Sequence, residues 1–201
     1  AERMVGAGAR LVGGCCGTTP QHIRTMRLAL DAYARTARKR TRIPSIASSE
    51  QDSKPIAHEP PTQLQQKLET GHFVVSVEMD PPRGFNPDAV LAGAMILKQA
   101  GAGVIHVAHS PRAQIRMSAW AVAHLIQIEV GAEAVLHFPV RGRNLLRVHG
   151  DLMAAHALRV RNIFAVMGDP AATGDYPQAT DAYDIVPSGL VKLIKQHFNQ
   201  G

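Results

Sequence analysis

The feature that most constrains the fold of this chain is a strict alternation of two apolar patterns after residue 63. Short apolar runs of strand length alternate with longer segments in which apolar residues recur every three to four positions, as on one face of a helix. The predicted strands cover residues 72–79, 103–109, 132–138 and 160–168, and the predicted helices cover 87–101, 116–131, 144–158 and 188–198. This alternation is typical of an α/β fold with a parallel sheet and helical crossovers.

Two α/β architectures are compatible with this pattern, an open doubly wound sheet and a (β/α)8 TIM barrel. A doubly wound sheet that binds a dinucleotide carries G-x-G-x-x-G after its first strand. In this chain the first strand after residue 63 is followed by Asp80-Pro81-Pro82, without such glycines, and this favours the barrel. Because a complete barrel needs at least about 200 residues, we expect residues 63–201 to form only the N-terminal half of one.

The segment before residue 63 predicts one further strand–helix unit and a linker. Residues 9–14 have the pattern of a short buried strand, and Thr19-Pro20 is typical of a helix start, so a helix is predicted from about residue 20 to 40. Residues 41–62 are rich in proline, serine and charge without periodicity, as in a linker. The predicted organisation is one strand–helix unit within residues 1–40 and half a barrel in residues 63–201, joined by the linker 41–62.

Composition excludes several protein classes. The chain has two cysteines, no apolar run near the roughly 18 residues of a membrane span and no signal-peptide core at its start. We therefore exclude a disulfide-stapled scaffold and expect a soluble, cytoplasmic protein that binds no membrane. The net charge of +6 is concentrated in residues 1–43, where nine Lys or Arg residues face only Glu2 and Asp31. Cations stabilise a helix C-terminus, and this positive charge lies at the end of a predicted helix, so it does not require a nucleic-acid partner and we expect none. The alternative is that the segment makes the protein a non-catalytic basic adaptor.

A pair of adjacent cysteines follows the first predicted strand. Cys15 and Cys16 lie between Gly14 and Gly17 and just before a predicted helix. Glycines can relax the backbone so that both sulfur atoms face one point, and a helix N-terminus lowers the pKa of a thiol. Two thiolates are half of a tetrahedral zinc site, whereas an arbitrary pair of cysteines would be two small buried apolar residues.

Polar residues also stand at the ends of three strands after the linker. Glu78 precedes Asp80-Pro81-Pro82, His137 ends the third of these strands, and Gly168-Asp169 ends the fourth. Barrel enzymes place their chemistry at the carboxyl ends of the strands. One such residue would be an ordinary strand-end group, but three that converge on one face predict an active site.

The region of the cysteines resembles the zinc-dependent homocysteine S-methyltransferases. The segment GARLVGGCCGTTPQHIRTM is similar to the C-terminal signature of that family. The resemblance implies that Cys15 and Cys16 bind zinc together with a third cysteine that lies before Ala1. The zinc would hold homocysteine as a thiolate nucleophile.

The strand-end residues after the linker resemble those of the methylenetetrahydrofolate reductases, which are flavin-bearing (β/α)8 barrels. The resemblance implies that Glu78 is the general acid that opens the methylene bridge of the folate. It also implies that His137 and Gly168 contact FAD, and that Asp169 lies near the flavin and the pterin. The activity implied is reduction of 5,10-methylenetetrahydrofolate to 5-methyltetrahydrofolate with NAD(P)H.

The order of the two segments resembles that of bifunctional proteins that fuse the two enzymes. This resemblance implies two partial TIM barrels, in residues 1–40 and 63–201, joined by the linker 41–62. The chain departs from the reductases at Met167, where many carry Arg, and at Gly142, where many carry Asp. We expect this piece alone to be inactive, because half a barrel leaves sheet edges unpaired. A homo-oligomeric full-length protein is compatible with the sequence, and another barrel enzyme that uses strand-end carboxylates is the alternative function.

Overall fold

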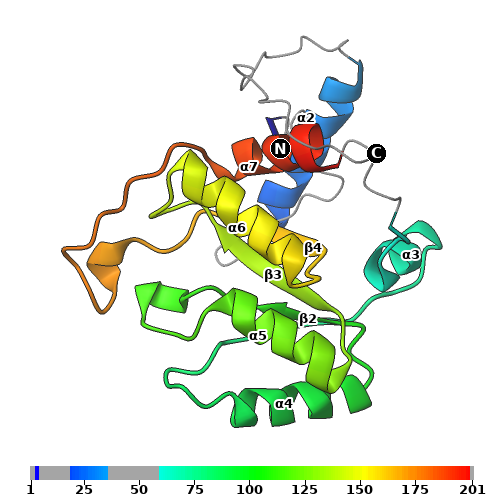
Figure 1. Cartoon of the computed structure of the whole chain (residues 1–201). Coiled ribbons are helices and arrows are strands. Elements are labelled where there is room, and N and C mark those ends of the chain that lie inside the picture. Colours follow the sequence, from blue (N-terminus) through cyan, green and yellow to red (C-terminus); the bar gives the residue numbers. More distant parts are fainter. Residues whose placement is uncertain (1–2, 5–18, 36–58, 200–201) are drawn as a thin grey trace, which may run out of the picture. The chain divides into compact units, whose positions relative to one another are not determined.

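The computed structural model of the chain describes residues 3–4, 19–35 and 59–199 (Figure 1). The chain divides into two compact units, one of residues 1–59 with 191–201 and one of residues 60–190. The predicted strand 9–14, Cys15 and Cys16, and most of the predicted linker lie outside the described residues. Each unit is considered by itself below.

The first unit contains helix α2 (Pro20–Arg35). The helix begins at Pro20 as predicted, because proline has no N–H to leave unsatisfied at the first helical position. The preceding Thr19 forms hydrogen bonds with the ring of His22, through its backbone N–H to Nδ1 at 3.0 Å and between Oγ1 and Nδ1 at 3.2 Å. The backbone carbonyl of Thr19 accepts from Ile23 N–H, which closes the first turn.

The second unit is built on a four-stranded parallel sheet. Its strands are β1 (Ser76–Met79), β2 (Val104–Val107), β3 (Ala134–Pro139) and β4 (Asn162–Val166), and they lie in the order β1-β2-β3-β4. The parallel α/β class predicted from the alternation is confirmed. A doubly wound sheet reverses its strand order at a switch point, and these four strands show no reversal. This consecutive order is compatible with successive units of a barrel.

The predicted helices of this unit form with small changes of boundary. They are α4 (Asp88–Gln99), α5 (Ala119–Leu125) with a π-helical turn η2 (Ile126–Val130), and α6 (Leu145–Ala157). The predicted helix 188–198 forms as α7 (Pro187–Leu193) and the π-helical turn η4 (Ile194–Phe198), and its residues from Val191 onward belong to the first unit. The α5–η2 helix ends at Gly131, whose φ of 65° suits a residue without a side chain. The side chain of Asn144 caps α6 by accepting from Arg147 N–H.

The sequence prediction missed some short elements and overestimated one strand. Helix α3 (Gln63–Glu69) was not predicted, because it is too short and too polar to show an apolar period. It is held from outside, since Glu133 accepts a hydrogen bond from Leu64 N–H at 3.0 Å. The 3₁₀ turns η1 (Pro111–Ala113) and η3 (Ala171–Thr173) were also missed. Strand β1 does not begin at residue 72, as predicted. It begins at Ser76, the residue that pairs with Val104 of β2.

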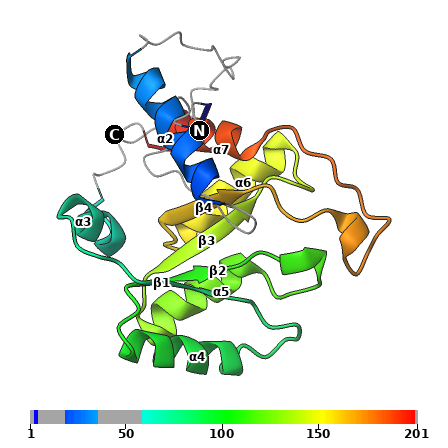
Figure 2. The same ribbon diagram turned by 180° about the vertical axis from the view of Figure 1, so that it is seen from behind.

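The two faces of the sheet differ in their surroundings. Helices α4, α5 and α6 lie on one face (Figure 1), and the side chains that point to them, such as Ile105, Val107, Leu136 and Phe138, are fully buried. Figure 2 shows the strands from the other side. We call this second side the open face, because Phe164 of β4 is 49% exposed on it.

Candidate active site

Strand register brings four chemically distinctive side chains onto the open face. In parallel strands, residues that pair across the ladder point to the same side of the sheet. Glu78 of β1 pairs with His106 of β2, and His137 of β3 pairs with Phe164 of β4. His106 pairs with Val135, two residues before His137, so all four side chains belong to one face.

Two histidine rings meet at the centre of this face. His106 Nδ1 and His137 Nε2 are 3.1 Å apart, a hydrogen-bond distance, and the rings are perpendicular with centroids 5.3 Å apart. We call these two residues the histidine pair. His137 Nε2 also lies 4.0 Å from Glu78 Oε2, which is too long for a hydrogen bond. The ring of Phe164 packs against both histidines. Its centroid lies 5.8 Å from the ring centroid of His106 and 4.9 Å from that of His137.

The histidine pair is held in its neutral form. Burial lowers the pKa of His137 to about 4, and the neighbouring His106 adds to this effect. Burial also lowers the pKa of His106. Transfer of an imidazolium out of water is unfavourable unless a partner compensates it. Both rings are therefore uncharged near neutral pH.

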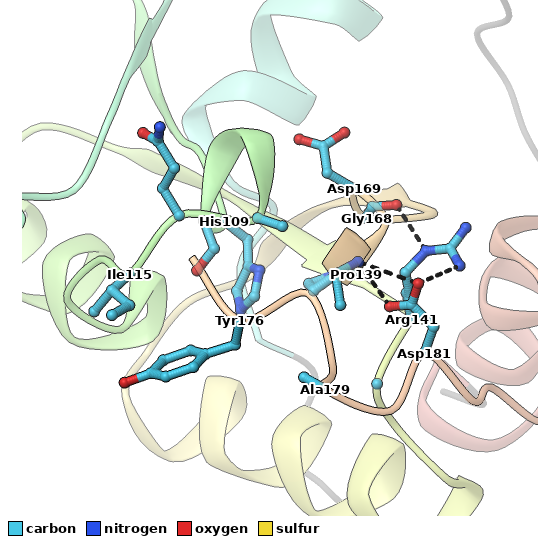
Figure 3. Close-up of a pocket in the computed structure, with 14 residues that line it drawn as sticks. His109, Ile115, Pro139, Arg141, Gly168, Asp169, Tyr176, Ala179 and Asp181 are labelled. Atoms are coloured by element: carbon cyan, nitrogen blue, oxygen red, sulfur yellow. Dashed lines mark hydrogen bonds and ion pairs between the residues drawn. The ribbon is translucent and has the colours of Figure 1, made fainter. Parts of the chain in front are cut away.

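A cavity of about 260 Å³ opens at the carboxyl ends of β3 and β4 (Figure 3). Pro139 lies two residues beyond His137 on β3 and lines this cavity, so the cavity adjoins the open face. Gly168 also lines it with a φ of +87°, and a Cβ added there would come within 3.2 Å of Pro139 Cβ. The other lining residues include His109, Arg141, Asp169, Tyr176 and Asp181.

Two carboxylates connect the loops on either side of the cavity. Asp169 Oδ2 accepts from Arg112 N–H at 2.5 Å, and Asp175 Oδ2 accepts from Ile115 N–H at 2.7 Å. The loop after β2, which donates these two hydrogen bonds, has left-handed backbone at Ser110, Arg112 and Ala113. Because non-glycine residues adopt this conformation only at an energetic cost, the two carboxylates stabilise an otherwise unfavourable loop.

The sequence comparisons agree with this geometry. Residues 63–201 match the family described as methylenetetrahydrofolate reductase. The chain belongs to the methylenetetrahydrofolate reductase family. Residues 1–30 match homocysteine S-methyltransferase, so the chain joins a transferase family to an oxidoreductase family, in the order of a bifunctional fusion of one-carbon and methionine metabolism. No match was found among curated proteins.

Membership of these families implies particular ligands. The reductase family implies FAD and a folate substrate, and the methyltransferase family implies zinc and homocysteine. Across the described ranges, no three His, Cys, Asp or Glu side chains are grouped so as to hold a metal ion. Cys15 and Cys16 lie outside these ranges. None of the helices in the described part of the chain is long and apolar enough to cross a membrane.

Both departures from the reductases have a structural counterpart. Gly142, where many reductases carry Asp, has a φ of +70°, a conformation that favours glycine. Met167 stands where many reductases carry Arg, and here Arg141 brings a guanidinium to the same turn. Arg141 Nε donates to Gly168 O at 3.1 Å, and its Nη1 lies 3.5 Å from Asp181 Oδ2.

Behind the cavity lies a second polar network, which we call the arginine cluster: Arg143, Asp151 and Arg147. Asp151 is buried, and its two oxygens accept from Arg143 Nε at 2.9 Å and from Arg147 Nε at 2.8 Å. The guanidinium of Arg143 also packs over the ring of Trp120, with its Cζ 5.2 Å from the ring centroid. Its Nη2 lies 3.3 Å from His109 Nε2, and burial, followed by the charge of Arg143, lowers the pKa of His109 to about 4.

The predicted site residues are thus brought together only in part. Glu78 and His137 approach each other on the open face, whereas Gly168 and Asp169 line the adjoining cavity. The sequence analysis did not single out His106. A polar residue within the apolar strand VIHV was the available signal, but its partner depends on the register between strands.

Proposed function

We propose that the reductase segment catalyses the flavin-dependent reduction of 5,10-methylenetetrahydrofolate to 5-methyltetrahydrofolate, with NAD(P)H as the electron donor. The observation that carries this proposal is the approach of Glu78 and His137 on the open face of a parallel sheet, beside a cavity lined by Gly168 and Asp169. The family match over residues 63–201 supports the same chemistry.

The residues on this face fit a flat, partly polar ring system such as a flavin. Phe164 offers a half-exposed aromatic ring, and His137 beside it offers a ring nitrogen. The cavity adds the backbone at Gly168, the Asp169 carboxylate and the cationic Arg141. When bound, FAD supplies hydride chemistry between a pyridine nucleotide and the folate. In this proposal His137, Gly168 and Asp169 bind and orient the cofactor.

Glu78 is proposed as the general acid. Its side chain is 58% exposed on the open face and can therefore reach a substrate placed over the sheet. In its protonated form it would donate a proton to the nitrogen that leaves carbon when the methylene bridge opens. A positioned acid of this kind typically contributes about 10²- to 10⁴-fold to a rate.

The same proposal includes the domain organisation. Residues 63–201 would be the N-terminal half of a (β/α)8 barrel, residues 41–62 a linker, and residues 1–40 the last strand–helix unit of a methyltransferase barrel. The winding order of β1 to β4 supports the reductase half. The match of residues 1–30 supports a second activity, zinc-dependent methyl transfer to homocysteine, with Cys15 and Cys16 as two zinc ligands.

The test uses the protein that contains this chain, purified and reconstituted with FAD. We expect flavin absorbance to be bleached by NADH or NADPH without oxygen, and restored by 5,10-methylenetetrahydrofolate with formation of 5-methyltetrahydrofolate. Bleaching without restoration by the folate would reject the proposed substrate. Failure to bind flavin at all would reject the proposed cofactor.

A further inference from the structure

His106 is a polar residue in the interior of an apolar strand, and the function proposed above gives it no role. It lies between Glu78 of β1 and His137 of β3, and its Nδ1 is 3.1 Å from His137 Nε2. The strand otherwise consists of Val104, Ile105 and Val107, all fully buried. A valine or isoleucine at position 106 would suit this strand at least as well, so the histidine requires a chemical explanation.

The hydrogen bond within the histidine pair determines whether His137 Nε2 is available to interact with Glu78. A neutral imidazole nitrogen has either one proton or one lone pair in the ring plane. In the two tautomeric combinations that form a hydrogen bond, a single proton lies between His106 Nδ1 and His137 Nε2. Nε2 of His137 is therefore engaged by His106 at 3.1 Å, and Glu78 remains at 4.0 Å.

We propose that His106 is a positioning residue, which engages His137 as a neutral ring and so prevents an ion pair between His137 and Glu78. This inference rests on the proposed role of Glu78 as a general acid. An imidazolium beside a carboxylate stabilises the charged form of the carboxylate. A general acid must instead carry its proton when the substrate arrives.

The surroundings of His137 favour the same outcome. In the described part of residues 60–190, the titratable groups recorded against His137 are Glu78 from β1, His106 from β2 and, more distantly, His109 just beyond β2. Strand β4 contributes the uncharged ring of Phe164. Burial, with His106 as the second cause, lowers the pKa of His137 to about 4. Glu78 is thus the only group among them that could favour a cationic His137.

The experiment compares His106→Val with His106→Asn. Valine retains an apolar, β-branched residue in the strand but removes the ring nitrogen. Asparagine can place an amide group near the position of Nδ1 and so retain a hydrogen bond to His137. His72→Val is the matched control, because His72 is an exposed histidine before β1 whose ring nitrogen contacts Thr70.

The first readout needs neither flavin nor turnover. In ¹⁵N–¹H spectra of the flavin-free protein, we expect His137 of the wild type to show one neutral tautomer and to titrate near pH 4. In His106→Val the tautomer preference should weaken and the titration should move to higher pH. His106→Asn and His72→Val should resemble the wild type. An unchanged His137 titration in His106→Val would overturn the proposal.

The second readout separates the two half-reactions of the FAD-loaded protein. We expect His106→Val to slow flavin reoxidation by the folate roughly tenfold near neutral pH, within the range of general acid catalysis. Its pH profile should move to lower pH, while flavin reduction by NAD(P)H stays within about twofold. Equal losses in both half-reactions, or equal losses in His106→Val and His106→Asn, would mean that His106 only fills space. If the wild type does not reduce the folate, the proposed function fails, whereas the flavin-free titration still tests the hydrogen bond.

Discussion

The histidine pair and the arginine cluster lie in the same unit of the protein and handle charge in opposite ways. In the arginine cluster, buried Asp151 accepts hydrogen bonds of 2.8 and 2.9 Å from two arginines. In the histidine pair, burial holds both rings neutral, and the neighbouring Glu78 stays 4.0 Å away. Charge is directly paired where it joins the loop after β3 to α6. On the open face, where we propose catalysis, no residue in the described part of the chain forms so short an ion pair with Glu78.

The largest expected effect comes from removing the carboxyl group on the open face. Glu78→Gln should lower the rate of flavin reoxidation by 5,10-methylenetetrahydrofolate about 10²- to 10⁴-fold, because the amide cannot act as a general acid. Reduction of the flavin by NAD(P)H should remain close to that of the wild type. Stopped-flow measurement of the two half-reactions checks this, and a loss of the same size in both would contradict the role of Glu78.

The matching substitution in the arginine cluster should affect stability instead. Asp151→Ala leaves Arg143, whose side chain is only 13% exposed, without its carboxylate partner, and breaking a buried pair typically costs about 3–5 kcal/mol of unfolding free energy. Arg147→Ala is the matched control, because the Arg147 side chain is 69% exposed, and a pair of this kind contributes about 0.2–1 kcal/mol. Urea unfolding gives both values, and equal costs for the two variants would show that burial does not distinguish the two ion pairs.

The smallest expected effect is a dependence of stability on pH. Because burial lowers the pKa values of His137 and His109 to about 4, the native protein binds fewer protons below pH 6.5 than the unfolded chain. Stability should be at its full value above about pH 7 and fall as the pH decreases toward 4. The loss between pH 7 and pH 5 should be about 1–2 kcal/mol for each histidine.

Replacement of one histidine sharpens this prediction. His137→Asn should remove the share of the pH dependence that belongs to His137 and leave the shares of His106 and His109. Unfolding curves at pH 7, 6 and 5 test this, and an unchanged slope in His137→Asn would mean that His137 is not held neutral by the fold.

Much of the fold follows from local patterns in the sequence. The four strands after residue 63 and the helices between them were predicted because apolar residues recur with the period of a strand or of a helix. Helix α3 escaped prediction because its stability depends on distant groups, such as the Glu133 carboxylate that accepts from Leu64 N–H. The first residues of the predicted strand 72–79 have the composition of a strand, but they are not part of β1. They precede Ser76, where pairing with β2 begins.

The candidate site was predictable only where a residue stands at the end of a strand. Glu78, His137, Gly168 and Asp169 could be selected because consecutive parallel strands end at one edge of the sheet. The sequence did not predict that His106 contacts His137, because the register between β2 and β3 depends on the packing of the helices behind them. It also did not predict that Asp169 binds Arg112 N–H, since that contact joins two loops 57 residues apart.

The sequence by itself determined the alternation of strands and helices, the parallel class of the sheet and the strand-end position of the candidate acid, because these depend on residues close together in the chain. Tertiary structure alone decided which polar groups form ion pairs and which form hydrogen bonds between neutral rings. The distances of 3.1 Å within the histidine pair and 2.9 Å between Arg143 and Asp151 arise from packing between separate elements. Packing buries both networks: burial lowers the pKa of His137 and leaves it neutral, whereas Asp151 and its two arginines pair as ions.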